Sequence, residues 1–250
     1  MLTFVGLGLW DEKDITLRGL EAVRNADLVY AEFYTSKLNA SVEDLQRFFK
    51  KEIKVLRRED LEEKGIEIIE KAKEKNVVLL IAGDPMIATT HVSILIEARR
   101  IGVNAIVINN ASIMNAVCSL TGLQSYRFGK SATVSWHKSR AFMDVIKANL
   151  SIDAHTLLFL DLNPPMRIHE AIERILDLEE GFKDHFTVGI ARAGSPKPEV
   201  KCDRIEKLLK HDFGDPLHVL VLLSRRIHFM EYESLKLLAF APDDLREWVS

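Results

Sequence analysis

The loop Gly83-Asp84-Pro85 directly follows a continuous apolar run over residues 77–82. Such a run, ended by turn residues, is typical of a buried parallel strand that delivers a loop to the edge of a sheet, where α/β proteins place ligands. Gly83 can adopt backbone angles closed to other residues, Pro85 fixes its own φ angle, and Asp84 supplies a short anionic acceptor. The same residue types are common in ordinary turns, so this loop alone does not define a site.

Three more loops carry small or polar residues at the ends or flanks of apolar segments, namely residues 110–113, 191–195 and 214–218. Together with the Gly83 loop, they place two loops in each half of the chain. Small residues and free backbone groups around an apolar face indicate a cleft between domains that holds an amphipathic ligand with an aromatic base. Within these loops, Arg192 and His218 fit a structural polar role about as well as a ligand contact.

Three motifs match known phosphate-binding or kinase sequences only in part. Gly6-Leu7-Gly8-Leu9 begins like a dinucleotide fingerprint, but Asp11 occupies the third glycine position. Gly129-Lys130-Ser131 matches the end of a P-loop, but Gln124 replaces the upstream glycine. Asp212-Phe213-Gly214 matches a kinase segment, but neither a catalytic His-Arg-Asp sequence nor a glycine loop that covers phosphates precedes it. The sequence therefore argues against Rossmann-type dinucleotide binding, nucleoside triphosphate hydrolysis and kinase activity.

Composition limits the class of protein. The chain has 250 residues, 47% of them hydrophobic, and a formal net charge of −3, which argues against a sequence-blind nucleic-acid binder. Cys118 and Cys202 lie far apart without other ligands at metal-binding spacing, so we expect neither a disulfide framework nor a metal site. The N-terminus has no basic region before an apolar one, and no apolar run approaches the length of a membrane span. We expect a soluble, cytoplasmic protein.

The first half of the chain alternates short apolar segments with amphipathic ones. Apolar residues at helical spacing, such as Ile66, Ile69 and Ala72, alternate with strand-like runs, which predicts βαβ units and a mostly parallel sheet. Asp14 precedes the first of these helices, where we expect it to act as a cap. The predicted strands are residues 3–9, 27–33, 53–56, 77–82 and 103–108, and the predicted helices are residues 15–26, 42–51, 61–75, 91–100 and 111–120.

The second half indicates another α/β domain. Its predicted strands are residues 132–136, 155–160, 186–193 and 217–223, with helices over residues 141–150, 168–178, 204–210 and 231–239. Gly122 offers a natural end to the preceding helix, and Gly122 and Gly129 bracket the expected boundary. We therefore predict an N-terminal α/β domain over residues 1–121 and a C-terminal α/β domain over residues 122–250.

Taken together, these segments resemble the diphthine synthase family, which belongs to the tetrapyrrole methylase superfamily of class III S-adenosylmethionine-dependent methyltransferases. The resemblance spans nearly the whole chain. Gly83-Asp84-Pro85 alone would indicate only the superfamily. The segments most specific for the family are residues 31–36, Ala-Glu-Phe-Tyr-Thr-Ser, and residues 128–133, Phe-Gly-Lys-Ser-Ala-Thr.

The resemblance implies a homodimer of chains with two α/β domains of the tetrapyrrole methylase type, each chain holding S-adenosylmethionine in the cleft between its domains. Asn110 stands where the family pattern has Pro, and Met86-Ile87 replaces a smaller aliphatic pair. The resemblance identifies no catalytic residue and no metal ligand. Carried over position by position, the expected cofactor contacts are Leu9, Asp84, Ile87, Ser112, Ile113, Leu160, Ala193 and His218.

The activity implied by the resemblance is trimethylation of an amino group. The substrate would be the 3-amino-3-carboxypropyl-histidine of translation elongation factor 2, and the products would be diphthine, a precursor of diphthamide, and S-adenosylhomocysteine. No direct nucleic-acid or membrane binding is expected. The alternatives are a corrinoid-precursor or ribosomal-RNA ribose methyltransferase of the same superfamily, or a non-catalytic binding member.

Overall fold

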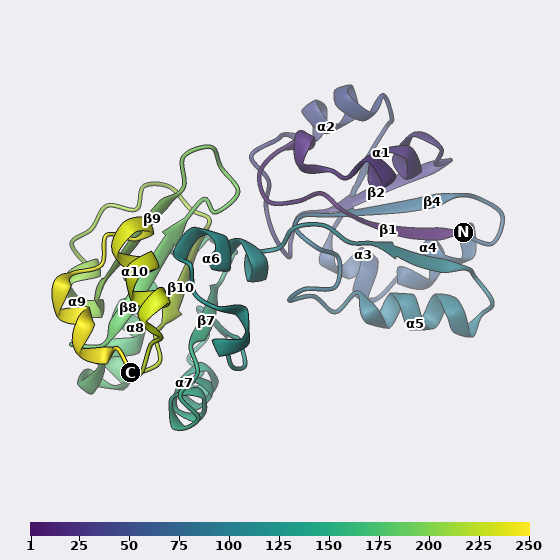
Figure 1. Cartoon of the computed structure of the whole chain (residues 1–250). Coiled ribbons are helices and arrows are strands. Elements are labelled where there is room, and N and C mark those ends of the chain that lie inside the picture. Colours follow the sequence, from purple (N-terminus) through teal and green to yellow (C-terminus); the bar gives the residue numbers. More distant parts are fainter. The chain divides into compact units, whose positions relative to one another are not determined.

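The computed structural model describes residues 1–250 and divides into two compact units, Met1–Ile113 and Met114–Ser250 (Figure 1). The division falls at the first residues of helix α6, Ile113–Thr121. The boundary expected at residues 121/122 lies at the other end of the same helix. Each unit contains its own five-stranded sheet and its own hydrophobic core.

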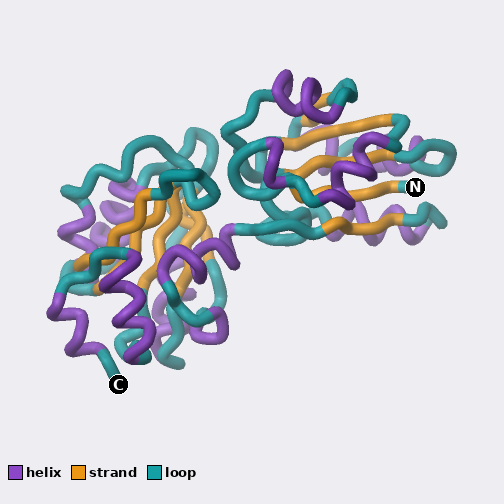
Figure 2. The backbone as a smooth tube through the Cα atoms, turned by 45° about the horizontal axis from the view of Figure 1, so that its top comes forward, coloured by secondary structure: helices purple, strands orange, loops and turns teal.

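The sheet of the first unit is entirely parallel and has the strand order β3-β2-β4-β1-β5. Figure 2 shows these strands side by side with helices on both sides. The continuous apolar run identified in the sequence forms a fully buried strand near the middle of the sheet. The strands are β1 Leu2–Gly6, β2 Leu28–Glu32, β3 Lys54–Leu56, β4 Val77–Ile81 and β5 Ala105–Ile108.

Helices cover both faces of this sheet. On one face, residues such as Val5 and Leu80 pack with Val23 and Leu45 of α1 and α2; on the other, Phe4 and Leu79 pack in the core that also holds Ile69 and Ala98 of α4 and α5. Alternate residues of each strand therefore enter different cores, as expected for a sheet buried on both sides. The helices are α1 Leu17–Arg24, α2 Val42–Phe49, α3 Arg58–Glu62, α4 Gly65–Lys71 and α5 Val92–Arg100.

The single helix predicted over residues 61–75 is wrong, because the structure has two short helices there. Helix α3 ends at Glu62 and α4 starts at Gly65. Lys64, between them, has φ −116° and ψ 12°, outside the helical region. Glycine is a poor helix former, so a break beside Gly65 costs little.

The sheet of the second unit is mixed, in the order β6-β7-β10-β8-β9. Only β6 and β7 run parallel, while β10 is antiparallel to both β7 and β8. Strand β9 lies at the edge, antiparallel to β8, and was not predicted from the sequence. The strands are β6 Ala132–Val134, β7 Thr156–Leu160, β8 Phe186–Ala191, β9 Glu199–Arg204 and β10 His218–Leu222.

Four helices besides α6 complete the second unit. Phe142 and Ile146 of α7 and Ile172 of α8 pack in one core with Leu158 and Leu220 of the sheet. Gly122 ends α6 as the sequence predicted: its φ is +73° and its N–H donates to the Cys118 carbonyl at 2.8 Å. The helices are α7 Ala141–Ser151, α8 Ile168–Leu178, α9 Ile205–Leu208 and α10 Phe229–Leu238.

A buried polar network fixes the start of α10 in the second unit. His155 and Glu231 are fully buried, and His155 Nε2 lies 3.2 Å from Glu231 Oε1. The Ser224 N–H donates to His155 Nδ1 at 2.9 Å, so Nε2 carries the proton and donates to Glu231. Burial opposes ionisation of Glu231, but the hydrogen bond from His155 and those from the Gln124 and His228 N–H groups outweigh it and lower its pKa.

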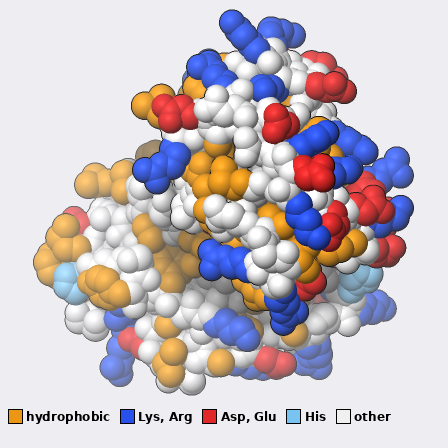
Figure 3. Space-filling view, turned by 90° about the vertical axis from the view of Figure 1, so that its right-hand side faces the viewer, with side chains coloured by type: hydrophobic (Ala, Val, Ile, Leu, Met, Phe, Trp, Pro, Cys, Tyr) orange, Lys and Arg blue, Asp and Glu red, His pale blue; other side chains and the backbone are white.

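The surface in Figure 3 carries acidic and basic side chains interspersed with apolar ones. Among the exposed apolar side chains, Val92 and Ile96 belong to α5 and Leu237 and Leu238 to α10. None of the helices combines the length and the apolar character that crossing a membrane requires.

Candidate functional site

Three loops of the first unit meet at the carboxyl edge of its sheet, after β1, β4 and β5. Gly8 and Gly83 form a backbone bridge, with the Gly83 N–H donating to the Gly8 carbonyl at 2.6 Å. A Cβ added at Gly6 would lie 2.6 Å from the Gly83 oxygen and 2.7 Å from Asn110 Cβ. Gly83 has φ +75°, a conformation that favours glycine. Only glycines let the three loops approach so closely.

Asp84 joins two of these loops through its carboxylate. Its side chain is buried, at 7% exposure, and Oδ1 accepts from the Met86 N–H at 2.9 Å. Oδ2 accepts from Asn109 Nδ2 at 2.9 Å and from the Asn110 N–H at 3.1 Å. The carboxylate therefore holds the loop after β4 against the loop after β5, although each oxygen keeps acceptor capacity. Asp84, an expected cofactor contact, therefore organises two of the loops that carry predicted contacts.

Asn110 connects the remaining pair of loops. Its Nδ2 donates to the Gly6 carbonyl at 2.8 Å and to the Asp14 carbonyl at 3.0 Å, and its Oδ1 accepts from the Ala111 N–H at 2.7 Å. The residue that departs from the family pattern thus ties the end of β1 to the end of β5. A proline at this position could not make the two Nδ2 bonds.

Asp14 does not cap helix α1, contrary to the sequence-based prediction. Thr16 is the N-cap residue, and its side chain accepts from the Gly19 N–H. Asp14 Oδ2 accepts instead from the N–H groups of Leu9 and Trp10, at 3.1 and 2.8 Å. The carboxylate thereby shapes the loop that contains Leu9, one of the predicted cofactor contacts.

The five predicted contacts of the first unit occupy this edge. Leu9 follows β1, Asp84 and Ile87 follow β4, and Ser112 and Ile113 follow β5 at the start of α6. Ile87 is 38% exposed and Leu9 is half-buried, so both offer apolar surface. Ser112 is buried.

The three predicted contacts of the second unit also gather at one edge of their sheet. Leu160 ends β7, His218 begins β10, and Ala193 follows β8. Val219 pairs with Phe159, and His218 pairs with Ala191. Because β10 runs antiparallel to β7 and β8, its first residue lies beside their carboxyl ends.

The structure distinguishes Arg192 from His218. Arg192 Nη1 donates to the carbonyls of Phe213 and Asp215 at 2.7 and 2.6 Å, so its guanidinium braces the loop before β10. His218 is 5% exposed and accepts from the Ile168 N–H through Nδ1 at 3.1 Å, so its proton lies on Nε2. No group forms a well-made hydrogen bond with that buried Nε2.

His218 is a neutral donor at physiological pH. Burial lowers its pKa to about 4; the Asp215 carbonyl opposes the change, and the cationic Arg167 and Arg192 reinforce it. A buried N–H without a partner is costly unless a ligand or water accepts from it. This donor at the edge that also carries Leu160 and Ala193 favours a ligand contact over a purely structural role.

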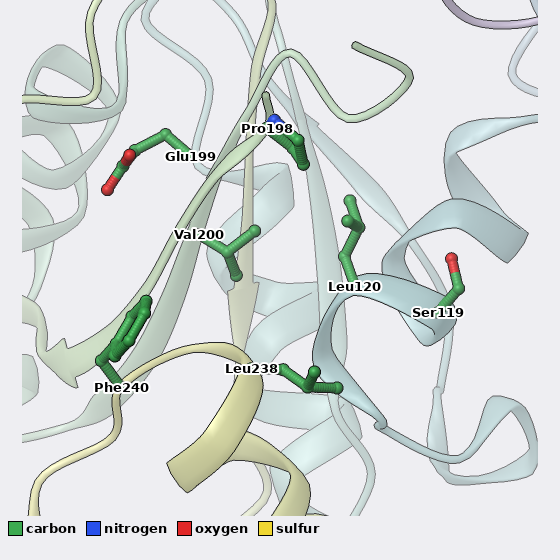
Figure 4. Close-up of a pocket in the computed structure, with 7 residues that line it drawn as sticks. All are labelled: Ser119, Leu120, Pro198, Glu199, Val200, Leu238 and Phe240. Atoms are coloured by element: carbon green, nitrogen blue, oxygen red, sulfur yellow. The ribbon is translucent and has the colours of Figure 1, made fainter. Parts of the chain in front are cut away.

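A separate pocket of the second unit, with a volume of about 210 Å³, contains none of the predicted contacts (Figure 4). Leu120, Val200 and Phe240 are among the side chains that line it. The volume is below the 300–1,000 Å³ typical of sites for drug-sized ligands. We therefore do not assign the cofactor to it. Nor does the structure contain a cluster of three His, Cys, Asp or Glu side chains that could hold a metal ion.

The parallel sheet, the mixed sheet and the glycine-rich edge agree with a known family. The model of the tetrapyrrole (corrin/porphyrin) methylases matches residues 1–209, and the chain belongs to this family. Among curated relatives, diphthine synthase of Archaeoglobus fulgidus is 59% identical, with all of both chains covered. Diphthine synthase of Methanocella arvoryzae is 49% identical, and the alignment covers 96% of this chain and 98% of the relative.

Solved structures give the same result. A crystal structure of diphthine synthase matches with a TM-score of 0.98 and 59% identity, covering 99% of each chain. A putative diphthine synthase from Entamoeba histolytica matches with a TM-score of 0.85 and 36% identity, covering 97% of this chain and 99% of the other. The predicted fold class is confirmed, and the fold and these similarities define a methyltransferase of this family.

Sequence reasoning missed the residues that hold the loops in place. Asn109 and the side-chain bonds of Asn110 were not predicted, although two adjacent asparagines after a strand are a recognisable signal. Glu32 and His91 are both buried, but neither was assigned a role from the sequence: Glu32 lies in the family segment 31–36, and His91 begins a predicted helix. Nothing local in the sequence indicates that these two side chains meet.

Proposed function

We propose that this protein is an S-adenosylmethionine-dependent N-methyltransferase of diphthamide biosynthesis. It would trimethylate the amino group of the 3-amino-3-carboxypropyl-histidine of translation elongation factor 2 to give diphthine. The observation that carries the proposal is the full-length similarity to diphthine synthases, at 59% identity and a TM-score of 0.98. The loop geometry of both units supports it.

The residues present fit the proposed cofactor. In the first unit, Gly6, Gly8 and Gly83 let the backbones of two loops lie close together at a sheet edge, with no side chain at these positions to exclude a ligand. In the second unit, the buried Nε2–H of His218 forms no well-aligned hydrogen bond, although the Asp215 carbonyl lies near it, and can donate to a nucleoside oxygen or nitrogen. We propose the remaining contacts at Leu9, Asp84, Ile87, Ser112, Ile113, Leu160 and Ala193. The binding edge of each unit is then built chiefly from backbone and apolar groups.

The proposed chemistry demands little from ionisable side chains. Bound S-adenosylmethionine supplies a methyl group that its sulfonium already activates. An α-amino group has a reference pKa of about 7.7 to 8.0, so part of the amine is neutral at physiological pH and can attack without a strong protein base. The protein's task is to hold the amine in line with the methyl group. Such orientation can contribute about 7 to 11 kcal/mol.

We infer further that the protein acts in the cytoplasm as a homodimer, with elongation factor 2 as its protein substrate and without binding nucleic acid directly. The formal net charge of −3 is consistent with a protein substrate rather than with a polyanion. Exposed apolar side chains of α10, including Leu237 and Leu238, are available to a partner.

The direct test is a methylation assay followed by mass spectrometry. The protein is incubated with labelled S-adenosylmethionine and elongation factor 2 that carries the aminocarboxypropyl-histidine. The proposal predicts up to three methyl groups on the amine. A matched elongation factor without the modification is the control. Label in a corrinoid precursor or in ribosomal RNA, and none in the modified factor, would replace the proposal with one of the alternatives.

A further inference from the structure

Glu32 is a fully buried carboxylate at the end of β2, inside the family-specific segment 31–36. Its Oε2 accepts from the N–H groups of Tyr34 and Thr35, both at 3.1 Å, and its Oε1 accepts from the Thr35 hydroxyl. Burial raises the pKa of Tyr34 to about 12, and the nearby Glu32 and Glu62 carboxylates add to the effect, so this phenol is neutral. A fully buried carboxylate requires a close polar or charged partner.

His91 is the group placed to be that partner. It precedes α5, is 1% exposed, and its Nε2 lies 3.5 Å from Glu32 Oε1, within ion-pair range. Its Nδ1 lies 3.2 Å from the Pro85 carbonyl oxygen. The imidazole therefore bridges the segment after β2 and the loop after β4, which contains Asp84 and Ile87.

The two ring nitrogens of His91 have different surroundings. Nδ1 faces the Pro85 carbonyl, which can only accept, so Nδ1 carries a proton and donates to it. Nε2 is buried beside Glu32 Oε1 but forms no hydrogen bond within the protein. The ring is therefore held by Pro85 on one side and lies against the Glu32 carboxylate on the other.

We propose that His91, packed against Glu32, positions the Gly83–Asp84–Pro85 loop for cofactor binding by donating from Nδ1 to the Pro85 carbonyl. His91 is a positioning residue, since it acts through the Pro85 carbonyl. This role rests on the proposed function, because it assumes that the loop after β4 binds S-adenosylmethionine.

Two substitutions separate the two sides of the bridge. His91→Asn keeps a donor near the Nδ1 position, facing Pro85, and loses the contact with Glu32. His91→Gln keeps a donor near the Nε2 position, facing Glu32, and loses the contact with Pro85. We expect each to weaken S-adenosylhomocysteine binding about tenfold in calorimetry, because networked pairs couple strongly. The KM for the methyl donor should rise, with kcat largely retained.

His211→Gln is the matched control, because His211 forms a partly exposed histidine–glutamate pair, with Nε2 2.8 Å from Glu199 Oε1. We expect this variant to bind S-adenosylhomocysteine within about twofold of the wild type, since a pair that solvent reaches contributes little. Hydrogen exchange should become faster at residues 83–90 in both His91 variants and remain unchanged there in the control. Unchanged affinity in both His91 variants would overturn the positioning role.

Nitrogen-15 NMR of the ligand-free wild-type protein tests the structural half of the proposal independently of activity and of any variant. We expect Nδ1 of His91 to show the shift of a protonated nitrogen, because it donates to the Pro85 carbonyl. A lone-pair signal from Nδ1 in the wild type would refute the bridge. If the wild type bound no S-adenosylhomocysteine, the proposed function would fail, while the NMR result would still decide the state of His91.

Discussion

Asp84 shows how one side chain can organise a binding edge without being the reacting group. Its carboxylate accepts from Met86, Asn109 and Asn110, and all three donors belong to the loops that carry predicted contacts. Hydrogen bonds to a charged group contribute about 1.5 to 3 kcal/mol each, which is enough to fix a loop. At the scale of single residues, the site depends on such carboxylates together with the donor of His218.

Replacing Asp84 should therefore weaken cofactor binding by more than the accompanying loss of folding stability would explain. In Asp84→Asn, one acceptor oxygen becomes a donor that faces other donors, and we expect S-adenosylhomocysteine affinity to fall about tenfold or more. Isothermal titration calorimetry measures the change. Wild-type affinity in the variant would show that Asp84 does not organise the loops that bind the ligand.

The control for this substitution is Asp27→Asn. Asp27 Oδ2 accepts from the Asn76 N–H at 2.8 Å, next to the starts of β2 and β4 and therefore at the opposite edge of the same sheet. This variant should lose a similar hydrogen bond and some stability, but keep its affinity for S-adenosylhomocysteine. A loss of affinity equal to that of Asp84→Asn would indicate a general effect of unfolding.

At the scale of elements, the two glycines that follow helices α5 and α6 have different roles. Gly102 and Gly122 follow α5 and α6, and both have positive φ angles, +79° and +73°. Their surroundings differ, because nothing lies within 4 Å of a Cβ added at Gly102, whereas a Cβ at Gly122 would collide with Ser234. Gly122 therefore serves the packing of α6 against α10 as well as the turn.

The two glycines give a matched prediction. Gly102→Ala should lower the free energy of unfolding by about 1 to 2 kcal/mol, the cost of a left-handed conformation for a residue with a Cβ. Gly122→Ala should lower it by about 1 to 3 kcal/mol more, because the added methyl group is also overpacked. Chemical denaturation measures both. Equal losses would show that Ser234 moves aside freely.

Most elements were predictable from the sequence because their apolar periodicity is local. The buried strand β4 and the amphipathic helix α2 are examples. Strand β9 was missed because only Val200 and Cys202 of its six residues are buried, so that its alternation is short and interrupted by charges. The break between α3 and α4 was missed because helical periodicity continues across Gly65.

The positions of the site residues were predictable from the sequence, but the side chains and N–H groups that contact them were not. The resemblance pointed to Asp84, yet its partners Asn109 and Asn110 are 25 and 26 residues away in sequence. The Glu32–His91 pair likewise joins separate βα loops. Such pairs arise from the strand order of the sheet, which brings distant loops to one edge, and no local pattern encodes them.

At the scale of the whole molecule, buried histidines make stability depend on pH. Burial lowers the pKa of His185 to about 4, although its hydrogen bond with the Leu223 carbonyl opposes the change. The pKa of His218 is also lowered to about 4. Between pH 6.5 and about 4, the unfolded chain binds more protons than the folded one at these sites, so stability falls as the pH falls through this window.

For His185 alone, the difference between about 4 and 6.5 corresponds to at most about 3 kcal/mol once the pH is well below 4. We expect His185→Gln to show a smaller loss of stability between pH 6.5 and 4 than the wild type, measured by denaturation at each pH. His137→Gln, on the exposed surface, controls for the introduction of glutamine. An unchanged pH dependence in His185→Gln would contradict the assignment.

The central claim is that loops at one sheet edge of each unit bind the methyl donor. The most direct measurement is a crystal structure of the protein with S-adenosylhomocysteine. We predict the ligand against the loops that follow β1, β4 and β5 of the first unit. Binding in the pocket around Leu120 and Phe240 instead, or no binding at concentrations that saturate related methyltransferases, would contradict the claim.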